Sequence, residues 1–571
     1  MQISTLEKLP ATSETLKMRY IKLSGPKNGR HVCPPQPNWN HSIGVGLALT
    51  ALAGCGGSDD AGESRETRDR DNASSGSIQS NDTESYFMGL GPPSIQPYWT
   101  SSLVMSKPEQ TVVPMLNSYS RVIEFSFPII QPEYKQIDVL GWQPSTWQMK
   151  VAAREIFEKL GSYLDVTFVE VADTLDKNVI ALATSKQTDT TGFAYFPNPD
   201  FDLGMDVFIS EDYSRPRVVS LETTNYDYQV LLHEIGHALG LKHPFEVDGE
   251  NRSVLSPRED DSSYTVMSYN ASLTTFSGDL RVLDLMALTK LYGVNPSFKA
   301  GDNIYEFSNN SGNFIIDGDG TDSIIYRGNQ DAFLDLRSGG HSYLGEKSAF
   351  ISAPKQLTIS EGSQIENAIT GSGDDVVIGN ELGNLLITAG GDDYIFAGEG
   401  GDVVSSGAGS DIVDLSEDVP VADVLNYTLE FGDPDFDVIG GFSQGSGGDQ
   451  LNFKSFFSTA PIVTPLIDKT NVPNARVDNS IVRIIGNIFD TPQNLNAALS
   501  MDGVLSNLSL SAHHRSLFVA ADTQAAGEDQ RLFAAYNTGD DLIINQLAVF
   551  EGGHLDIDSW MIGNFSGDFI A

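Results

Sequence analysis

The stretch Leu231–Pro244 (LLHEIGHALGLKHP) constrains this chain more than any other part of it. Two histidines four residues apart on a helix project from the same face, so His233 and His237 can bind one metal ion together. The carboxylate of Glu234, between them, is then free to act as a base. An ordinary amphipathic helix is the competing interpretation of these residues alone.

The residues after the helix favour the metal site. Gly240 allows the chain to leave helical geometry, because glycine adopts left-handed backbone angles at little steric cost. The resulting turn can bring His243 round as a third nitrogen ligand, and Pro244 prevents the helix from resuming. Three protein ligands and one open position are typical of a catalytic zinc ion, whereas a structural zinc site has four.

Size and charge narrow the class of protein. With 571 residues the chain is too long for a single core, so two or three domains are expected. Its 77 acidic and 35 basic side chains give a formal charge of −42, which excludes a nucleic-acid-binding role. An acidic, glycine-rich chain of this kind has either a highly solvated surface or many calcium sites. The two cysteines, Cys33 and Cys55, precede the folded part, so zinc must be held by nitrogen and oxygen ligands.

The N-terminal region has the features of an export signal. Residues 43–54 form an uncharged run of twelve, too short to span a bilayer. The run ends in Leu52–Cys55 (LAGC), which resembles the lipobox at which bacterial lipoproteins are cleaved and acylated. We therefore expect a leader over 1–55 with a lipid anchor at Cys55, and a disordered linker or pro-segment over 56–115. A chance apolar stretch in a disordered leader is the alternative, and no transmembrane helix is expected.

Residues 116–300 have the pattern of an α+β domain. Alternating or apolar runs predict strands at 122–127, 166–171, 179–183, 192–197 and 206–209. A helix is expected from Thr146 to a stop at Gly161, with apolar residues at spacing four. Pro197 marks 192–197 as an edge strand, because proline cannot donate a ladder hydrogen bond. A mixed sheet on one long helix, followed by the zinc helix, is the architecture predicted.

Two further stretches carry a resemblance to a known family. Tyr264–Tyr269 (YTVMSY) follows the zinc motif, and this combination is similar to the metzincin peptidases with their Met-turn. The zinc helix, Leu283–Gly293 (LDLMALTKLYG) and the repeats below narrow the resemblance to serralysins, over roughly residues 120–571. It implies an α+β zincin-like (metzincin) catalytic domain followed by an all-β parallel β-roll (RTX) domain.

The resemblance also implies residue roles. Met267 would lie beneath the zinc as a hydrophobic floor, and the Tyr269 hydroxyl would support the oxyanion of the transition state; a simple structural role is the alternative for each. Glu234 would take a proton from a zinc-activated water and deliver it to the leaving amine. A peptide substrate would add as a strand along the edge that contains Ala194 and Tyr195.

A nine-residue repeat covers residues 370–414. Five nonapeptides follow one another, with Asp375, Asn384, Asp393, Asp402 and Asp411 at the sixth position and an aliphatic residue at the eighth. The pattern matches the calcium-binding nonapeptide of RTX proteins. The aliphatic residues keep strict register, which argues against a flexible Gly/Asp linker. The calcium ligands are expected at Gly371, Gly373, Asp375, Asp393, Gly398, Gly400, Asp402, Gly407, Gly409 and Asp411. The unit with Asn384 departs from the pattern and is expected to bind no ion.

The predicted roll spans 301–435, and a β-rich segment over 436–571 follows it. Gly567–Ala571 is similar to the ending of type I secretion substrates. The resemblance implies a secreted, extracellular monomer that meets protein or peptide substrates, type I secretion machinery and a proteinaceous inhibitor. If Cys55 is acylated, the protein is instead tethered to the outer membrane as a lipoprotein.

The leading interpretation is thus a zinc metalloendopeptidase with one catalytic Zn²⁺ and several structural Ca²⁺ ions. One alternative is a calcium-dependent surface adhesion or display protein with a non-catalytic metzincin-like scaffold. Another is a zinc hydrolase acting on a bond other than a peptide bond, which the Met-turn disfavours.

Overall fold

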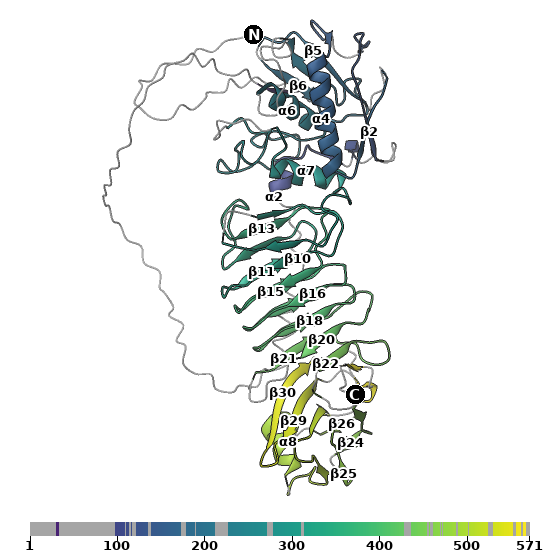
Figure 1. Cartoon of the computed structure of the whole chain (residues 1–571), viewed down its shortest axis with the longest axis vertical. Helices are drawn as coiled ribbons and strands as arrows, with labels where there is room; N and C mark the ends of the chain where they lie inside the picture. The colour runs from purple at the N-terminus through teal and green to yellow at the C-terminus, as the bar shows by residue number, and fades with distance from the viewer. Residues whose placement is uncertain are drawn as a thin grey trace, which may run out of the picture.

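The protein is seen here in a computed structural model, which describes residues 30–33 and, with internal gaps, 98–566. The longest of these gaps is 212–225. Most of the predicted leader and linker, and the C-terminal Gly567–Ala571, lie outside the described residues. The molecule is elongated, with helices α2, α4, α6 and α7 at one end, a stack of short strands in the middle, and longer strands with helix α8 at the other end (Figure 1).

The helix-bearing unit (residues 98–300) is built on a sheet with the strand order β1-β6-β7-β5-β2-β4, and β3 pairs with β5. Strands β4, β2, β5 and β7 run parallel to one another, whereas β6 is antiparallel to β7 and to β1, and β3 is antiparallel to β5. The strand bounds are Arg30–Cys33 (β1), Val122–Ser126 (β2), Gln143–Pro144 (β3), Thr167–Glu170 (β4), Val179–Ser185 (β5), Gly192–Tyr195 (β6) and Val207–Ser210 (β7). The predicted mixed sheet is therefore present, but β6, which was predicted as its edge strand, has β1 on its outer side.

The longer helices of this unit are α4 (Trp147–Tyr163), α6 (Tyr226–Ala238) and α7 (Val282–Tyr292). Helix α4 begins where Thr146 caps it, since the hydroxyl oxygen accepts a hydrogen bond from the Met149 amide at 3.2 Å. It buries an apolar face that includes Ile156 and Leu160. The predicted stop at Gly161 is two residues early, because the helix continues to Tyr163 before Leu164 turns extended.

A short segment before residue 116 belongs to this unit. Helix α2 (Tyr98–Ser101) and the residues after it place Trp99 and Leu103 in the same hydrophobic core as the zinc helix. The prediction of a disordered linker to residue 115 is therefore wrong in its last part. The cause is that the segment is short and lacks a clear apolar period, so its burial depends on contacts with distant residues.

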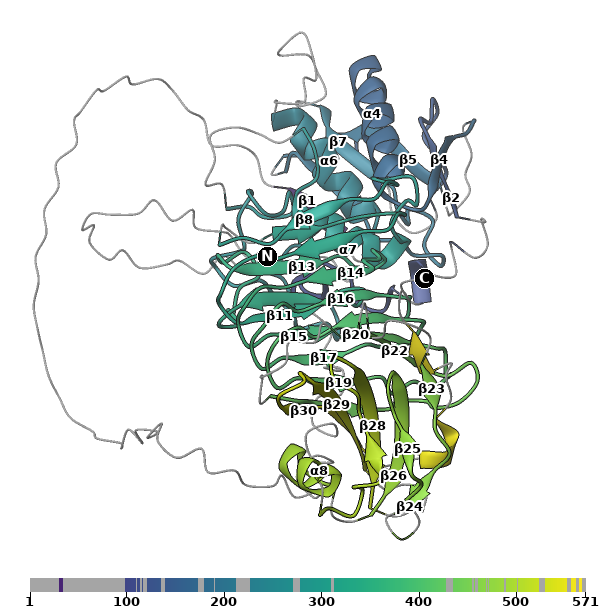
Figure 2. The ribbon, with the colours of Figure 1, turned by 60° about the horizontal axis from the view of Figure 1, so that its bottom comes forward.

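The middle of the molecule is a parallel coil (Ile304–Phe453). From β14 to β22 each successive strand joins the opposite one of two sheets, and neighbours within a sheet are parallel. Figure 2 shows these strands running across the molecule one above another. The bounds are Ile304–Glu306 (β8), Asn313–Ile315 (β9), Ser323–Ile325 (β10), Ala332–Asp335 (β11), His341–Leu344 (β12), Gln356–Ile359 (β13), Asn367–Ile369 (β14), Val376–Ile378 (β15), Leu385–Ile387 (β16), Tyr394–Phe396 (β17), Val403–Ser405 (β18), Ile412–Asp414 (β19), Val424–Tyr427 (β20), Asp437–Gly440 (β21) and Gln450–Phe453 (β22).

The aliphatic residues at the eighth repeat position fill the space between the two sheets. Val377, Leu386, Ile395, Val404 and Val413 are all at most 1% exposed and lie in one core cluster. Each is the middle residue of a three-residue strand whose neighbours are partly exposed. The period-two alternation within each strand therefore sets which side chain enters the core.

The C-terminal region does not begin a separate unit at residue 436. Strand β21 pairs with β19 of the repeats on one side and with β30 on the other, so the coil passes through the predicted boundary. Longer antiparallel strands, with helix α8 packed nearby, then close this end. The bounds are Ile462–Val463 (β23), Ile467–Asp468 (β24), Ala475–Arg476 (β25), Ser480–Ile485 (β26), Pro492–Leu499 (α8), Leu508–Ser509 (β27), Arg515–Ala521 (β28), Gln530–Asn537 (β29), Leu542–Phe550 (β30), a 3₁₀ turn at Ile557–Ser559 and Phe565–Ser566 (β31).

The helix-bearing unit and the coil are joined by buried polar contacts. Glu259 is fully buried, and its carboxylate accepts hydrogen bonds from the Tyr98 hydroxyl at 2.7 Å and from the Ser352 hydroxyl at 2.8 Å. Lys290 of α7 forms an ion pair with Glu361 of the coil at 2.8 Å. In the part of the chain that the structure describes, no helix has the length and apolarity needed to cross a membrane.

Candidate metal centre

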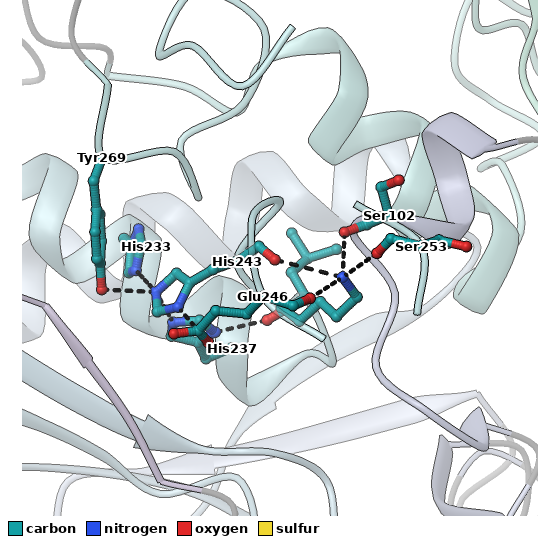
Figure 3. Close-up of polar contacts among 9 residues, drawn as sticks. Ser102, His233, His237, His243, Glu246, Ser253 and Tyr269 are labelled. Carbon is teal, nitrogen blue, oxygen red and sulfur yellow. Dashed lines mark hydrogen bonds and ion pairs between the residues drawn. The ribbon is translucent and has the colours of Figure 1, made fainter. Parts of the chain in front are cut away.

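Three histidine side chains converge at the C-terminal end of α6. His233 and His237 lie on successive turns of the helix, and the turn at Gly240, with a φ of +98°, returns His243 toward them. The Nε2 atoms of His233 and His237 lie 3.2 and 3.1 Å from Nε2 of His243 (Figure 3). All three rings are buried. Tetrahedral zinc with three nitrogen ligands needs nitrogens about 3.3 Å apart, so the spacing fits the ion.

The other ring nitrogens fix the protonation of these rings. Nδ1 of His233 lies 2.8 Å from the carbonyl oxygen of Val266, and Nδ1 of His237 lies 2.6 Å from that of Leu241. Nδ1 of His243 lies 3.0 Å from the Glu246 carboxylate. Each acceptor requires the proton on Nδ1, which leaves three Nε2 lone pairs directed at one point. These lone pairs repel one another unless a cation lies among them, so the donor set itself calls for a metal ion.

Glu234 lies in the same buried space. Its side chain is fully buried on α6, and a Cβ atom added to Gly192 of β6 would lie 2.7 Å from its Oε1. Only glycine fits at this position of β6 without displacing the carboxylate. The general-base candidate is therefore held between α6 and β6.

Met267 and Tyr269 approach the histidines from the Met-turn. The Tyr269 hydroxyl lies 2.8 Å from Nε2 of His243, at the point where the three rings meet. Met267 is fully buried, and its sulfur would lie 2.9 Å from a Cβ atom added to Gly236, which is on α6 between the two histidines. The structure thus brings every predicted residue of the zinc site together.

The Met-turn is fixed from helix α7. The Asp284 carboxylate accepts hydrogen bonds from the Thr265 hydroxyl at 2.5 Å and from the Val266 amide at 2.8 Å. The carbonyl of that same Val266 holds the His233 ring. Burial raises the pKa of Asp284 to about 6, and these hydrogen bonds act against the rise. Sequence reasoning noted the α7 stretch only as a family likeness and missed this connection.

The loop that carries His243 is fixed by a buried lysine. The ammonium group of Lys242 donates to the carbonyl oxygens of Ser102 at 2.7 Å, Glu246 at 2.8 Å and Ser253 at 2.9 Å (Figure 3). An ammonium group has three N–H donors, so these three acceptors satisfy it. Burial lowers the pKa of Lys242 to about 8. Its contact with Ser102 ties the loop of His243 to the segment that was predicted to be linker.

A second set of candidate ligands runs along the coil. One carboxylate oxygen of Asp393 accepts a hydrogen bond from the Asp375 amide at 2.8 Å. In the same way, Asp411 accepts from the Asp393 amide at 2.9 Å, and Asp437 accepts from the Asp411 amide at 3.2 Å. All four aspartates are buried. The ladder therefore continues past the last nonapeptide to Asp437, which the nine-residue period did not reveal.

A second series of amide-to-carboxylate hydrogen bonds runs along the opposite edge of the coil. The amides of Asn384, Asp402 and Asp423 donate to the carboxylates of Asp402, Asp423 and Asp449 at 2.7, 2.8 and 2.9 Å. The second carboxylate oxygen of Asp402 and of Asp423 has no hydrogen-bond partner among the described residues. Burial raises the pKa of Asp402 to about 7 and that of Asp423 to about 8. Buried carboxylate oxygens without partners fit a divalent cation, whose charge would stabilise the ionised form.

Two features of the turns agree with the predicted ligand pattern. Gly398 has a φ of +102°, and a Cβ atom there would lie 2.2 Å from the Asn380 carbonyl oxygen, so the turn requires glycine. Gly371, Gly373, Gly400, Gly407 and Gly409 also lie against the backbone of the adjacent turn. Asn384 instead exchanges hydrogen bonds with Asn380, whose amide donates at 2.8 Å.

Comparison with known proteins finds similar sequences for the part of the chain that carries this centre. Residues 210–279, which include the zinc helix and the Met-turn, match the model of the reprolysin-like M12B metallopeptidase family. A serralysin of Proteus mirabilis is 30% identical over 308 residues, covering 46% of this chain and 60% of its own length. The chain is a relative of the serralysin-type metzincins.

Other serralysin-type relatives agree with this result. A serralysin of Photorhabdus laumondii is 28% identical over 302 residues, which are 46% of this chain and 60% of that protein. The metallopeptidase AprA of Pseudomonas marginalis is 28% identical over 281 residues, which are 43% and 57%. The chain thus spans about three-fifths of the length of the curated relatives it matches, and the predicted resemblance to serralysins is confirmed.

Proposed function

We propose that this protein is a zinc-dependent metalloendopeptidase that hydrolyses peptide bonds in extracellular proteins. The observation that carries the proposal is the convergence of three buried histidine rings, with Nε2 of His233 and of His237 within 3.2 Å of Nε2 of His243, on the helix that also carries the buried Glu234. His233, His237 and His243 would hold the zinc ion. The serralysin relatives and the match to a metallopeptidase family support the same activity.

The residues around the ion have separate tasks. When bound, zinc lowers the pKa of a coordinated water to about 7 and polarises a carbonyl group. Glu234 accepts the proton of the attacking water and later delivers it to the leaving nitrogen. The Tyr269 hydroxyl, next to His243, donates to the oxyanion that develops on the substrate carbonyl. Met267 supports the helix from below at Gly236.

Strand β6 is the proposed place for substrate, on the side where β1 pairs with it in this structure. It is at the metal side of the sheet, because Gly192 contacts Glu234 and the Phe196 ring lies 6.0 Å from the His237 ring. An extended peptide added to this edge would bring one of its peptide bonds to the centre. Ala194 and Tyr195 direct their side chains into the protein core, so their backbone is what the strand offers.

Replacing Glu234 by glutamine tests the proposal. We expect Glu234→Gln to retain one zinc ion per chain and to lose at least about 10³-fold in casein hydrolysis in millimolar calcium. Glu158→Gln, at an exposed position of α4, is the matched control and should hydrolyse casein like the wild type. Activity retained in Glu234→Gln, or insensitive to a zinc chelator in the wild type, would contradict the proposal.

We further propose that the coil binds several structural calcium ions through the aspartate ladders. The orphan oxygens of Asp402 and Asp423 support sites on one edge, and the ladder through Asp375, Asp393 and Asp411 supports them on the other. Asn384 offers a neutral side chain that is already paired with Asn380, so no ion is proposed at that turn.

The remaining predictions concern the chain as a whole. Secretion of the protein follows from the proposed calcium sites, because only the extracellular medium supplies calcium at the required concentration. The lipid anchor at Cys55 and the type I secretion signal concern residues outside the described part and stay predictions, as do the inhibitor and the monomeric state. A non-catalytic adhesion scaffold would not need the three histidines and Glu234. All four side chains are present and buried at the centre.

A further inference from the structure

The Met-turn and the residue after it are held by two different carboxylates. Asp284 of α7 holds the first part of the turn. The second part, residues 268–270, carries Tyr269, whose hydroxyl lies 2.8 Å from Nε2 of His243. A carboxylate upstream of the turn, that of Asp260, holds this second part.

Asp260 contacts the residue on each side of Tyr269. One oxygen of its carboxylate accepts a hydrogen bond from the Ser268 hydroxyl at 2.6 Å, and the other accepts from the Asn270 side-chain amide at 2.9 Å. The Ser268 hydroxyl oxygen in turn accepts from the Asn270 backbone amide at 3.0 Å. Asp260 and Ser268 are buried, so water competes little for these hydrogen bonds. One carboxylate therefore fixes the backbone on both sides of the tyrosine.

The residue before Asp260 fastens the same turn to the coil. Oε2 of the buried Glu259 accepts from the Tyr98 hydroxyl at 2.7 Å, and Oε1 accepts from the amide and the hydroxyl of Ser352 at 3.1 and 2.8 Å. The backbone amides of Glu259 and Asp260 both donate to the carbonyl oxygen of Ser256, at 3.0 and 2.8 Å. The two carboxylates thus lie on one turn, and a displacement of Glu259 from the coil would also move Asp260.

The coil offers a fixed support at this point. Ile351, the residue before Ser352, is buried in the hydrophobic core of the helix-bearing unit, in the same cluster as Met267. Its backbone amide donates to the Tyr98 hydroxyl at 3.1 Å. Close packing of this kind transmits a displacement instead of absorbing it.

We propose that Glu259 and Asp260 are positioning residues, which hold the Tyr269 hydroxyl at the metal centre from the coil. This inference rests on the proposed function. A donor that stabilises an oxyanion acts only when it is preorganised, and a functional side chain must lie within about 0.5 Å of its productive place. The two carboxylates should affect the tyrosine and leave zinc binding intact, because the Nδ1 partners of the three histidines do not include them.

A double-mutant cycle in the full chain tests this pair. We expect Asp260→Ala to lower kcat for casein hydrolysis at least about tenfold, with KM and zinc affinity changed by at most about twofold, and Tyr269→Phe to lower kcat about 10²-fold. In the Tyr269→Phe background, Asp260→Ala should lower kcat by at most about twofold, because the hydroxyl that it positions is absent. An equal loss of kcat in both backgrounds would assign Asp260 a general structural role and overturn the inference.

Two further variants keep the test independent of one substitution. If Asp260→Ala fails to bind zinc, Ser268→Ala takes its place in the cycle, because it removes the hydroxyl that donates to the same carboxylate. On the coil side, Glu259→Gln replaces one acceptor oxygen by an N–H donor and should lower kcat severalfold, again only where Tyr269 is present. A kcat that Glu259→Gln leaves unchanged would overturn the part assigned to the coil.

Hydrogen exchange of the 268–270 amides gives a measurement without turnover. We expect faster exchange in Asp260→Ala and in Glu259→Gln. The control is Asp261→Asn, at the neighbouring half-buried residue whose side-chain oxygen accepts from the Ser263 amide, and its exchange should match the wild type. Equal exchange in all these proteins would contradict the inference. Failure of the proposed function is distinguishable, because the wild type would then not hydrolyse casein while Asp260→Ala still accelerated exchange.

Discussion

The metal centre and the parallel coil both gather ligands, but they do so over different distances in the sequence. In the coil, each aspartate contacts the equivalent residue one turn of the coil further on, 18 residues away in the repeats. At the metal centre, the partners of the three histidines are Val266, Leu241 and Glu246, and the loop of His243 is tied to Ser102. The coil is thus a sum of similar contacts at one repeated spacing, whereas the centre combines unlike contacts whose partners lie from 3 to 140 residues apart.

The largest effect should come from calcium withdrawal. Each site that is saturated at a thousandfold excess over its Kd stabilises the folded state by about 4 kcal/mol, and the coil offers several such sites. We expect a calcium-selective chelator to abolish the cooperative thermal transition of the coil, followed by far-ultraviolet circular dichroism. A zinc-selective chelator should remove activity and leave this transition in place. A coil that keeps its transition without calcium would contradict the proposed sites.

The next largest effect tests the coil core. Ile395→Ala removes a side chain that is 1% exposed between the two sheets and should lower the free energy of unfolding by about 2–5 kcal/mol. Val419→Ala, at a side chain that is 69% exposed, is the control and should change it by at most about 0.5 kcal/mol. Both would be measured by urea unfolding in saturating calcium. Equal effects would show that the repeats do not form a packed core.

These differences explain what the sequence could predict. The zinc ligands, the five strands of the repeats and their buried positions follow from short-range periods of four and nine residues. Asp423, Asp437 and Asp449 were missed because longer turns interrupt the nine-residue period before them. The role of the Tyr98 segment was missed because it depends on carbonyl groups, which every residue has. Composition and spacing carry no signal for such contacts.

Substitution of Lys242 tests whether the metal centre depends on contacts with residues distant in the sequence. Lys242→Met keeps most of the length of the side chain but removes the ammonium donor from the carbonyls of Ser102, Glu246 and Ser253, so the His243 loop should loosen. We expect zinc affinity, measured by competition with a chromophoric chelator, to fall about 10- to 100-fold. Calcium-dependent melting of the coil should not change.

The control for this substitution is Lys186→Met, at an exposed position of the same unit. It should bind zinc like the wild type. If Lys242→Met also binds zinc normally, the loop is held by its backbone contacts alone, and the centre would depend less on distant residues than we infer.

The smallest predicted effect is the pH dependence of the coil. Burial raises the pKa of Asp393 and Asp402 to about 7 and of Asp423 to about 8, from an ordinary value of 3.8. Without calcium, the folded coil therefore binds more protons than the unfolded chain between about pH 4 and 8, and its stability falls as pH rises through this range. Calcium needs the ionised carboxylates, so its stabilising effect should grow over the same range. The measurement is the melting temperature at pH 5 and 8, with and without calcium, and shifts of a few °C are expected. A calcium-dependent shift that is larger at pH 5 would show that these aspartates are not the ligands.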